Sequence, residues 1–246
     1  MSAPGPIGRS REGLGRRRGP RHSLALPAHE LDGFGVSSDP GGVVLGADEH
    51  GAPVRIQLFR SAPIRLVLLG GLYLAHQVAL RAAGTGSIVV VATGRPAAWT
   101  PMVHAAAVNG GDQQVAPVQV RDLGPAPLPR PAQDRPLLVF HDGGAAPQEL
   151  CPPRNAWQAT AVVLPYLHSQ IGTTATSADL VLLRRLPVGQ AQLAARLWAL
   201  TSAMVQVATT LADDGVLALG PDLELPVRLV TTPLESALLG PVRWGD

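Results

Sequence analysis

The stretch from Arg65 to Pro96 constrains the fold of this chain more than any other part of the sequence. It opens with a short branched apolar run, Arg65–Leu69, which ends in a pair of glycines. Leu72–Ala83 then lacks Gly and Pro and is rich in Leu and Ala, which favour helices. Ile88–Ala92 is a second apolar run. This order is typical of a β-α-β unit with a right-handed crossover and parallel strands buried on both faces.

The glycine pair stands where nucleotide-binding folds hold phosphate, because glycines let the backbone approach and a helix N-terminus presents free N–H groups. The side chains differ from those of known phosphate loops. A P-loop requires G-x-x-x-x-G-K-[ST] and a dinucleotide site requires G-x-G-x-x-G. This chain instead continues from Gly70-Gly71 with Leu72, Tyr73 and Leu74. We therefore expect a nucleotide-fold architecture without its phosphate chemistry.

Composition excludes several kinds of chemistry. All 20 basic residues are arginines, so the chain offers no lysine for a P-loop, a Schiff base or a general base. The single cysteine, Cys151, excludes an internal disulfide and a multi-cysteine metal site, which fits a reducing cytosol. The seven histidines show no H-x-x-x-H spacing, so we expect no metal site and no cofactor.

Positive charge is concentrated near the N-terminus. Residues 1–22 contain six arginines and one glutamate, whereas the remainder contains 14 arginines and 17 acidic residues. A nucleic-acid-binding domain would need its basic residues on a folded face, so we expect no sequence-specific nucleic-acid binding. Weak contact of this tail with RNA or anionic lipid is a separate hypothesis. No apolar run is long enough to span a membrane. We expect a cytoplasmic protein, peripheral to the inner face of the membrane at most.

The remaining pattern divides the chain in two. Residues 1–38 are rich in Gly, Pro, Ser and Arg and are expected to be disordered. Residues 39–246 are expected to form one α/β domain with three layers and a mostly parallel sheet. A β-hairpin should lead it, and the prolines of residues 121–136 predict a stiff, irregular connection. The predicted hairpin arms are Val43–Leu45 and Val54–Phe59. Helices are predicted at Ala97–Val108 and Val188–Leu211. Further strands are predicted at Val115–Val120, Leu137–Phe140, Ala161–Leu164, Leu180–Leu183, Val216–Leu219 and Val227–Val230.

A candidate ligand site combines Gly70, Gly71, Leu72, Thr93 and Asp142. Asp142 follows a predicted strand, where P-loop ATPases place a carboxylate that holds magnesium. Ligands of doubly wound sheets bind at the carboxyl ends of the strands, where these residues should lie. The alternative is structural, because His-Asp-Gly-Gly is also ordinary turn chemistry. We predict no catalytic residue.

Two further features are candidates for interaction with other molecules. Arg184 and Arg185 follow an apolar strand, either as an arginine finger for a neighbouring subunit's phosphate or simply as a strand leaving the core into solvent. A single apolar seam runs along the long predicted helix, as the core face of that helix or as a coiled-coil contact. The seam consists of Leu193, Leu197, Leu200, Met204, Val207 and Leu211.

Several segments stand in a recognisable order: GVVLGADEHGAPVRIQLF, RLVLLGGLYLAHQVALRA and IVVVATGRPAAW, then LLVFHD, ADLVLLRRLPVGQAQLAARLWAL and DDGVLALGPDLELPVRLVTTPLESALLG. This order resembles the hairpin, first strand, P-loop position, Walker B strand and closing strands of FtsK/HerA-type secretion ATPases, over residues 41–240. Asp142 matches their Walker B position. The Lys and Ser/Thr at the helix entrance are absent, so ATP hydrolysis does not carry over.

The chain also resembles the soluble part of EccE-type proteins, which are accessory subunits of actinobacterial type VII (ESX-like) secretion systems. That resemblance implies a non-catalytic scaffold with protein partners such as a secretion ATPase or translocon subunits. The alternative is a Rossmann-like nucleotide- or small-molecule-binding enzyme that uses the Gly70-Gly71 turn and Asp142. A nucleotide site predicts an open polar cleft at the helix entrance, whereas a scaffold predicts that Leu72 or Tyr73 fills that space.

Overall fold

The computed structural model describes residues 42–109, 116–144, 154–168, 171 and 176–241. All described residues belong to the unit of residues 39–246. Residues 1–38, which are predicted to be disordered, and the single cysteine, Cys151, lie outside the described residues.

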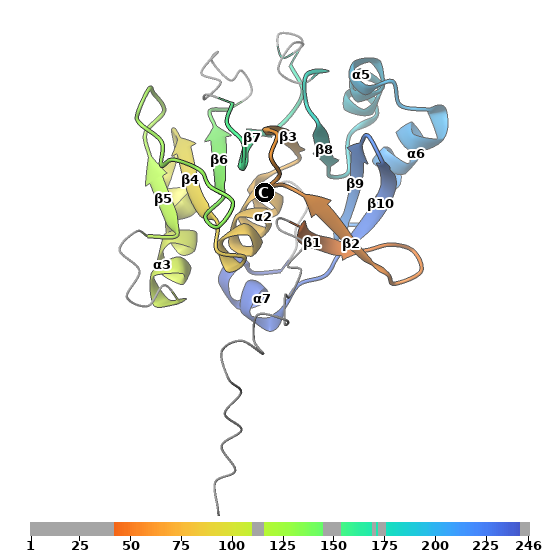
Figure 1. The fold of residues 1–246 in the computed structure, drawn as a ribbon. Helices are drawn as coiled ribbons and strands as arrows, with labels where there is room; N and C mark the ends of the chain where they lie inside the picture. Colours follow the sequence, from red (N-terminus) through yellow and green to blue (C-terminus); the bar gives the residue numbers. More distant parts are fainter. Residues whose placement is uncertain (1–41, 110–115, 145–153, 169–170, 172–175, 242–246) are drawn as a thin grey trace, which may run out of the picture. The chain divides into compact units, whose positions relative to one another are not determined.

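The described strands form one ten-stranded sheet in the order β2-β1-β10-β9-β8-β3-β7-β6-β4-β5 (Figure 1). The six strands from β8 to β5 are parallel, and the strands from β2 to β9 are antiparallel. The strands are β1 (Gly42–Ala47), β2 (Pro53–Gln57), β3 (Ile64–Leu69), β4 (Ile88–Thr93), β5 (Val118–Arg121), β6 (Leu137–Asp142), β7 (Gln158–Leu164), β8 (Leu180–Leu183), β9 (Gly215–Gly220) and β10 (Leu223–Leu229). The predicted mostly parallel α/β sheet with a leading hairpin is confirmed.

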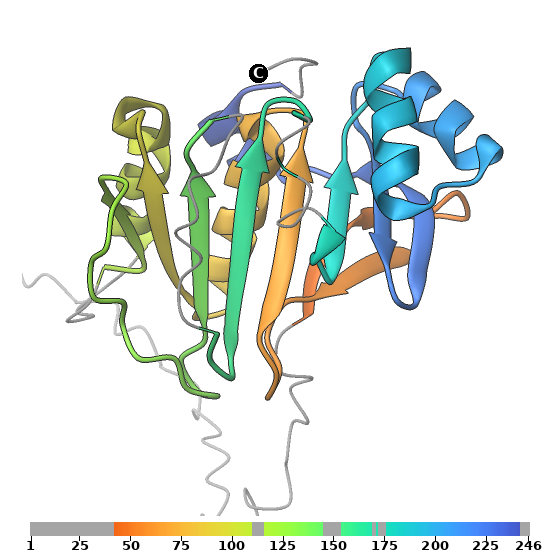
Figure 2. The same ribbon diagram turned by 90° about the horizontal axis from the view of Figure 1, so that it is seen from above.

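Helices cover both faces of the sheet (Figure 2). On the first face, α2 (Leu72–Gly84), α3 (Thr100–Asn109) and α7 (Pro233–Leu239) pack over the larger apolar cluster. On the second face, α5 (Val188–Trp198) and α6 (Ser202–Thr210) pack over a cluster from β3, β7, β8 and β9. A small third cluster on β4 and β6 lies beneath the irregular connection of residues 122–136. The three-layer arrangement is therefore present.

Two helix predictions need correction. The continuous helix expected over residues 188–211 is broken, because Ala199 adopts a left-handed conformation with φ of 54° and ends α5. Thr201 then caps α6 by accepting a hydrogen bond from the Met204 N–H at 3.2 Å. The helix expected from Ala97 begins instead as a short 3-10 helix, Pro96–Trp99, that leads directly into α3.

Candidate functional site

The turn between β3 and α2 has the geometry that the glycine pair predicts. Gly70 and Gly71 have φ of 112° and 108°, a region that favours glycine. The Gly70 N–H donates to the Leu164 carbonyl at 3.2 Å, and α2 begins without a side-chain cap. A strand, a glycine turn with positive φ and an uncapped helix N-terminus therefore meet at the carboxyl edge of the parallel strands.

Arg184 occupies the space beside this turn. A Cβ atom on Gly70 would lie 2.4 Å from the Cβ of Arg184, so only glycine fits there. Arg184 is 1% exposed, and its Nη2 donates to the Asp213 carbonyl oxygen at 2.6 Å. Its guanidinium carbon lies 5.9 Å from the centre of the buried Tyr73 ring, on the first turn of α2. The pairing of an arginine with an aromatic face is favourable where water is excluded.

The expectation that both arginines leave the core into solvent is wrong for Arg184, which lies inside it. Arg185 is half-buried and holds the turn before β9. It donates to the Asp213 carboxylate at 2.8 Å and to the Leu211 carbonyl at 3.3 Å. Parallel pairing of β8 with β3 fixes this arrangement, because the Arg184 N–H donates to the Leu69 carbonyl at 2.9 Å. The two arginines therefore hold the turn around Asp213 against the carboxyl end of β8.

Asp142 ends β6 and is fully buried, where it accepts hydrogen bonds from three side chains. Thr93 Oγ1 and Trp99 Nε1 each donate to its Oδ2 at 2.9 Å, and Arg95 Nη2 donates to its Oδ1 at 2.7 Å. Burial alone would raise the pKa of Asp142, but these hydrogen bonds lower it below its ordinary value. The carboxylate is therefore a charged structural centre joining β4, β6 and the start of α3.

His76 on α2 lies against this centre. Its ring stands edge-on to Trp99 with the centroids 4.6 Å apart, and Trp99 lies 5.3 Å from Phe140. Burial lowers the pKa of His76 to about 4, with a smaller opposing effect from the Asp142 charge. His76 is therefore neutral at pH 7.

The structure divides the predicted ligand-site residues into two groups. Thr93 and Asp142 meet on the neighbouring strands β4 and β6. Gly70, Gly71 and Leu72 lie at the end of β3, which β7 separates from β6. Leu72 is half-buried against the larger cluster, and it is Tyr73 that lies beneath the Arg184 guanidinium. Of the four predicted contact residues, Leu193, Leu197, Leu200 and Met204, all are half-buried and pack on the second-face cluster.

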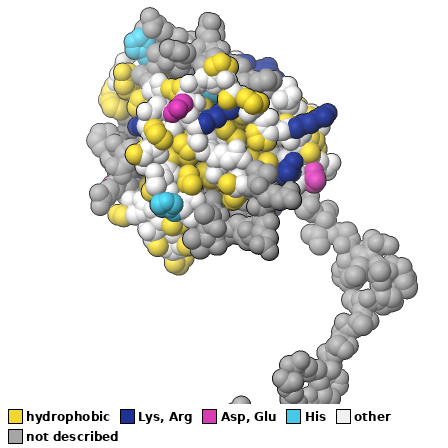
Figure 3. Space-filling model, turned by 90° about the vertical axis from the view of Figure 1, so that its left-hand side faces the viewer, with side chains coloured by type: hydrophobic (Ala, Val, Ile, Leu, Met, Phe, Trp, Pro, Cys, Tyr) yellow, Lys and Arg dark blue, Asp and Glu magenta, His cyan; other side chains and the backbone are white. Residues whose placement is uncertain are grey.

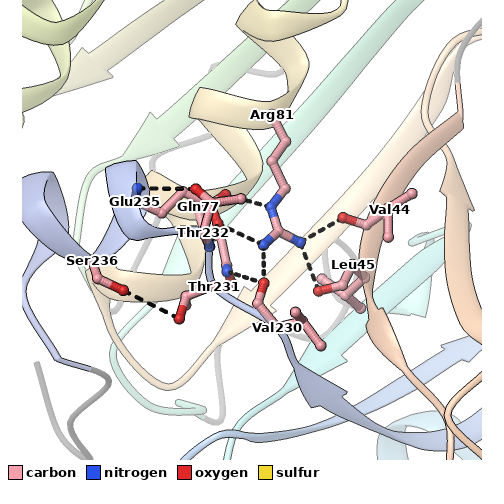
Figure 4. Close-up of polar contacts among 9 residues, drawn as sticks. All are labelled: Val44, Leu45, Gln77, Arg81, Val230, Thr231, Thr232, Glu235 and Ser236. Atoms are coloured by element: carbon pink, nitrogen blue, oxygen red, sulfur yellow. Dashed lines mark hydrogen bonds and ion pairs between the residues drawn. The ribbon is translucent and has the colours of Figure 1, made fainter.

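A polar clamp around Arg81 was missed by sequence reasoning (Figure 4). Arg81 on α2 donates to the Glu235 carboxylate at 2.6 and 2.9 Å and to the carbonyls of Val44 and Leu45 at 2.6 and 2.8 Å. It also donates to the Val230 carbonyl. Glu235 completes a capping box with Thr232 at the start of α7. The sequence does contain the pattern of this capping box, as Thr-Pro-Leu-Glu at residues 232–235.

The described residues contain no group of three or more His, Cys, Asp or Glu side chains placed to hold a metal ion. Among the same residues, none of the helices has the length and apolar character needed to cross a membrane.

The chain matches no protein-family model and no curated protein. Its structure is similar to the cytoplasmic domain of the Thermomonospora curvata type VII secretion ATPase EccC, with a TM-score of 0.45 and 9% sequence identity. The match covers 84% of this chain and 32% of that one, so the chain spans about a third of the ATPase domain's length.

Proposed function

We propose that the chain is a non-catalytic α/β protein that binds other proteins, as an accessory component of a type VII-like secretion system. The packing of Arg184 against Gly70 carries this proposal, because a buried side chain lies directly beside the turn where a nucleotide-binding fold would hold phosphate. The carboxylate of Asp142 already accepts three side-chain hydrogen bonds, and Arg95 balances its charge. A magnesium ion there would have to displace these donors. The secretion context rests on the resemblance in segment order.

The outer surface of α5 and α6 is the proposed contact with a partner protein. Large apolar side chains at half-exposed positions on paired helices suit a protein interface better than bulk water. Val188, in the first turn of α5, is 61% exposed. The half-buried apolar residues of these helices pack on the second-face cluster and leave only part of each side chain exposed: Leu193, Leu197, Trp198, Leu200, Met204, Val205 and Val207. By the resemblance, the partner is a secretion ATPase or a translocon subunit.

A matched pair of aspartate substitutions tests this surface. Val188 and Leu234 are 61% and 59% exposed, and each lies in the first turn of its helix, where a negative charge is favourable. Val188→Asp should therefore leave the fold intact, as should the control Leu234→Asp on α7. Binding is measured by biolayer interferometry against the purified cytoplasmic domain of the type VII secretion ATPase from the same organism.

We expect Val188→Asp to weaken this binding about tenfold, which corresponds to about 1.4 kcal/mol, with Leu234→Asp unchanged. Thermal unfolding of both variants confirms that the fold is retained. Equal loss in both variants would argue against the α5–α6 surface. No binding of the wild-type chain to the ATPase or to any purified translocon subunit of that system would argue against the proposed partner class.

A further inference from the structure

The second face of the sheet is covered unevenly. The helices α5 and α6 lie over β8 and β9, whereas residues 122–136 run over β4 and β6 (Figure 2). Among the described residues, Leu128 of this connection is the partly buried hydrophobic residue that packs on the small apolar cluster there. Within the described part of the chain, no helix covers the polar groups at the carboxyl end of β4, β5 and β6 on this face.

Arg121 and His141 lie on this face on either side of Ala92. In the register of the sheet, Ala92 pairs with Arg121 of β5 and with His141 of β6. Alternation along β6 turns Phe140 and Asp142 toward the first face, so His141 points to the second. The side chain of Ala92 ends at Cβ. The arginine and the histidine are therefore neighbours across a single small residue.

Each of these two side chains presents a buried nitrogen that has no hydrogen-bond partner among the described residues. The atoms are Nε of Arg121 and Nε2 of His141. Arg121 Nη1 donates to the Ala126 carbonyl at 3.2 Å, which holds the guanidinium over the sheet. Burial lowers the pKa of His141, and the Arg121 charge lowers it further. A buried nitrogen without a partner is costly, and Nε2 of His141 is a donor when it carries the ring proton, so an acceptor that reaches both atoms stabilises the pair.

The surroundings favour a small anion. Leu123 is 45% exposed and lies over two glycines, with its methyl carbon 3.6 and 3.7 Å from the Cβ positions of Gly94 and Gly143. The nearest buried carboxylate, Asp142, faces the other side of the sheet and is paired with Arg95, while Asp122 is exposed. On the side that β5 and α3 form, dark-blue arginine side chains stand among hydrophobic and uncharged ones (Figure 3).

We propose that Arg121 and His141 form a binding site for an oxyanion, the phosphate or carboxylate group of a small molecule. The anion accepts hydrogen bonds from Nε of Arg121 and Nε2 of His141, and the guanidinium charge neutralises it. The site lies at the carboxyl ends of parallel strands, the edge at which open α/β sheets hold ligands. It is separate from the Gly70-Gly71 turn and from Asp142, and it does not depend on the proposed protein partner.

Nuclear magnetic resonance of the histidine rings tests this site in the full chain. Sodium phosphate and sodium acetate are titrated in separate arms at constant ionic strength, set with chloride. The His141 resonance is assigned with His141→Gln. We expect a saturable shift of that resonance and a rise in the pKa of His141. Arg121→Gln should raise the anion concentration at half-saturation about tenfold or more, because a charge-assisted hydrogen bond is lost. The control, Arg130→Gln at an exposed position in the connection that follows β5, should behave as wild type.

The two arms distinguish the source of the anion. A response to phosphate alone identifies a phosphorylated ligand, a response to acetate alone identifies a carboxylate, and a response to both supports a general oxyanion site. No saturable shift with either anion overturns the proposal, as does an equal shift in Arg121→Gln. If Arg121→Gln fails to fold by circular dichroism, Arg121→Lys replaces it, because lysine keeps the charge and lacks the Nε donor. Unchanged affinity in Arg121→Lys would then count against the site.

Discussion

At the scale of single residues, the close contact between Gly70 and Arg184 determines what the turn after β3 can hold. Gly70→Ala should destabilise the protein by about 2–5 kcal/mol, because it adds backbone strain at φ of 112° and a Cβ atom 2.4 Å from Arg184 Cβ. Urea unfolding measures the loss.

Gly51→Ala provides the control for this substitution. Gly51 also has positive φ, at 83°, but a Cβ atom there would meet nothing within 4 Å. Only the strain remains, so we expect a loss of about 1 kcal/mol. Equal losses at the two positions would show that Arg184 does not fill the turn.

The buried His76 makes the free energy of unfolding depend on pH. Its pKa is lowered to about 4 in the folded protein from its ordinary value of 6.5, so the unfolded chain binds more protons between these values. Stability should therefore fall as pH decreases from 6.5 and level off near 4. Between pH 7 and 4.5 the expected loss from His76 is about 2 kcal/mol.

Urea unfolding at pH 7 and 4.5, for wild type and His76→Gln, measures this effect. The variant should lose less stability on acidification. His141 contributes in the same direction, because its pKa is also lowered, so some dependence should persist. Asp142 adds a further loss at lower pH, as its depressed pKa is approached from above. An identical pH dependence in His76→Gln would contradict the neutral, buried histidine.

At the scale of elements, the break between α5 and α6 depends on one backbone conformation. Ala199 has φ of 54°, which disfavours any residue with a Cβ atom, so Ala199→Gly should stabilise the protein by about 0.5–1 kcal/mol. The matched control is the exposed Ala203 in α6, where the same change should destabilise by about 1 kcal/mol. Thermal unfolding should give shifts of opposite sign. Destabilisation at both positions would indicate a continuous helix.

This break explains why the apolar pattern wrongly predicted one continuous helix over residues 188–211. The seam from Leu193 to Leu211 keeps its apolar spacing through Ala199, and periodicity does not report a single left-handed residue. Thr201 was the available signal, because a threonine three residues before Met204 fits a helix cap. Predicting a second helix would have required giving that local signal more weight than the periodicity.

At the scale of the whole molecule, Arg81 joins β1, the segment after β10, α2 and α7 through one guanidinium. The Arg81 and Glu235 side chains are 16% and 8% exposed, so removing either one leaves a buried charge. Arg81→Leu and Glu235→Leu should each cost about 3–5 kcal/mol. The double variant should cost clearly less than the sum of the two.

A double-mutant cycle by chemical denaturation measures this coupling. The more exposed pair Arg185–Asp213, at 35% and 58%, serves as the control, with an expected coupling below about 1 kcal/mol. Additive losses for Arg81 and Glu235 would show that the clamp does not hold the four elements together.

Features that depend on neighbouring residues could be predicted from the sequence, whereas features that depend on residues far apart in the chain could not. Apolar runs bounded by glycines predicted the strands and the β3–α2 turn, because these depend on neighbouring residues. The sheet order did not follow, since the pairing of β3 with β7 and β8 joins segments far apart in the chain. The burial of Arg184 was missed for the same reason, because its contacts with Gly70 and Tyr73 arise only from that pairing.

Thermal unfolding with nucleotides tests the central claim most directly. The wild-type chain is unfolded with ATP, GTP, NAD or S-adenosylmethionine at millimolar concentration. A ligand at about a hundred times its dissociation constant would stabilise the fold by about 2.7 kcal/mol. Because Arg184 packs against the turn and Asp142 already accepts hydrogen bonds from three side chains, we predict no shift with any of the four. A clear shift with one nucleotide, lost in Asp142→Ala or Gly71→Asp, would contradict the non-catalytic account and identify an unorthodox nucleotide-binding protein.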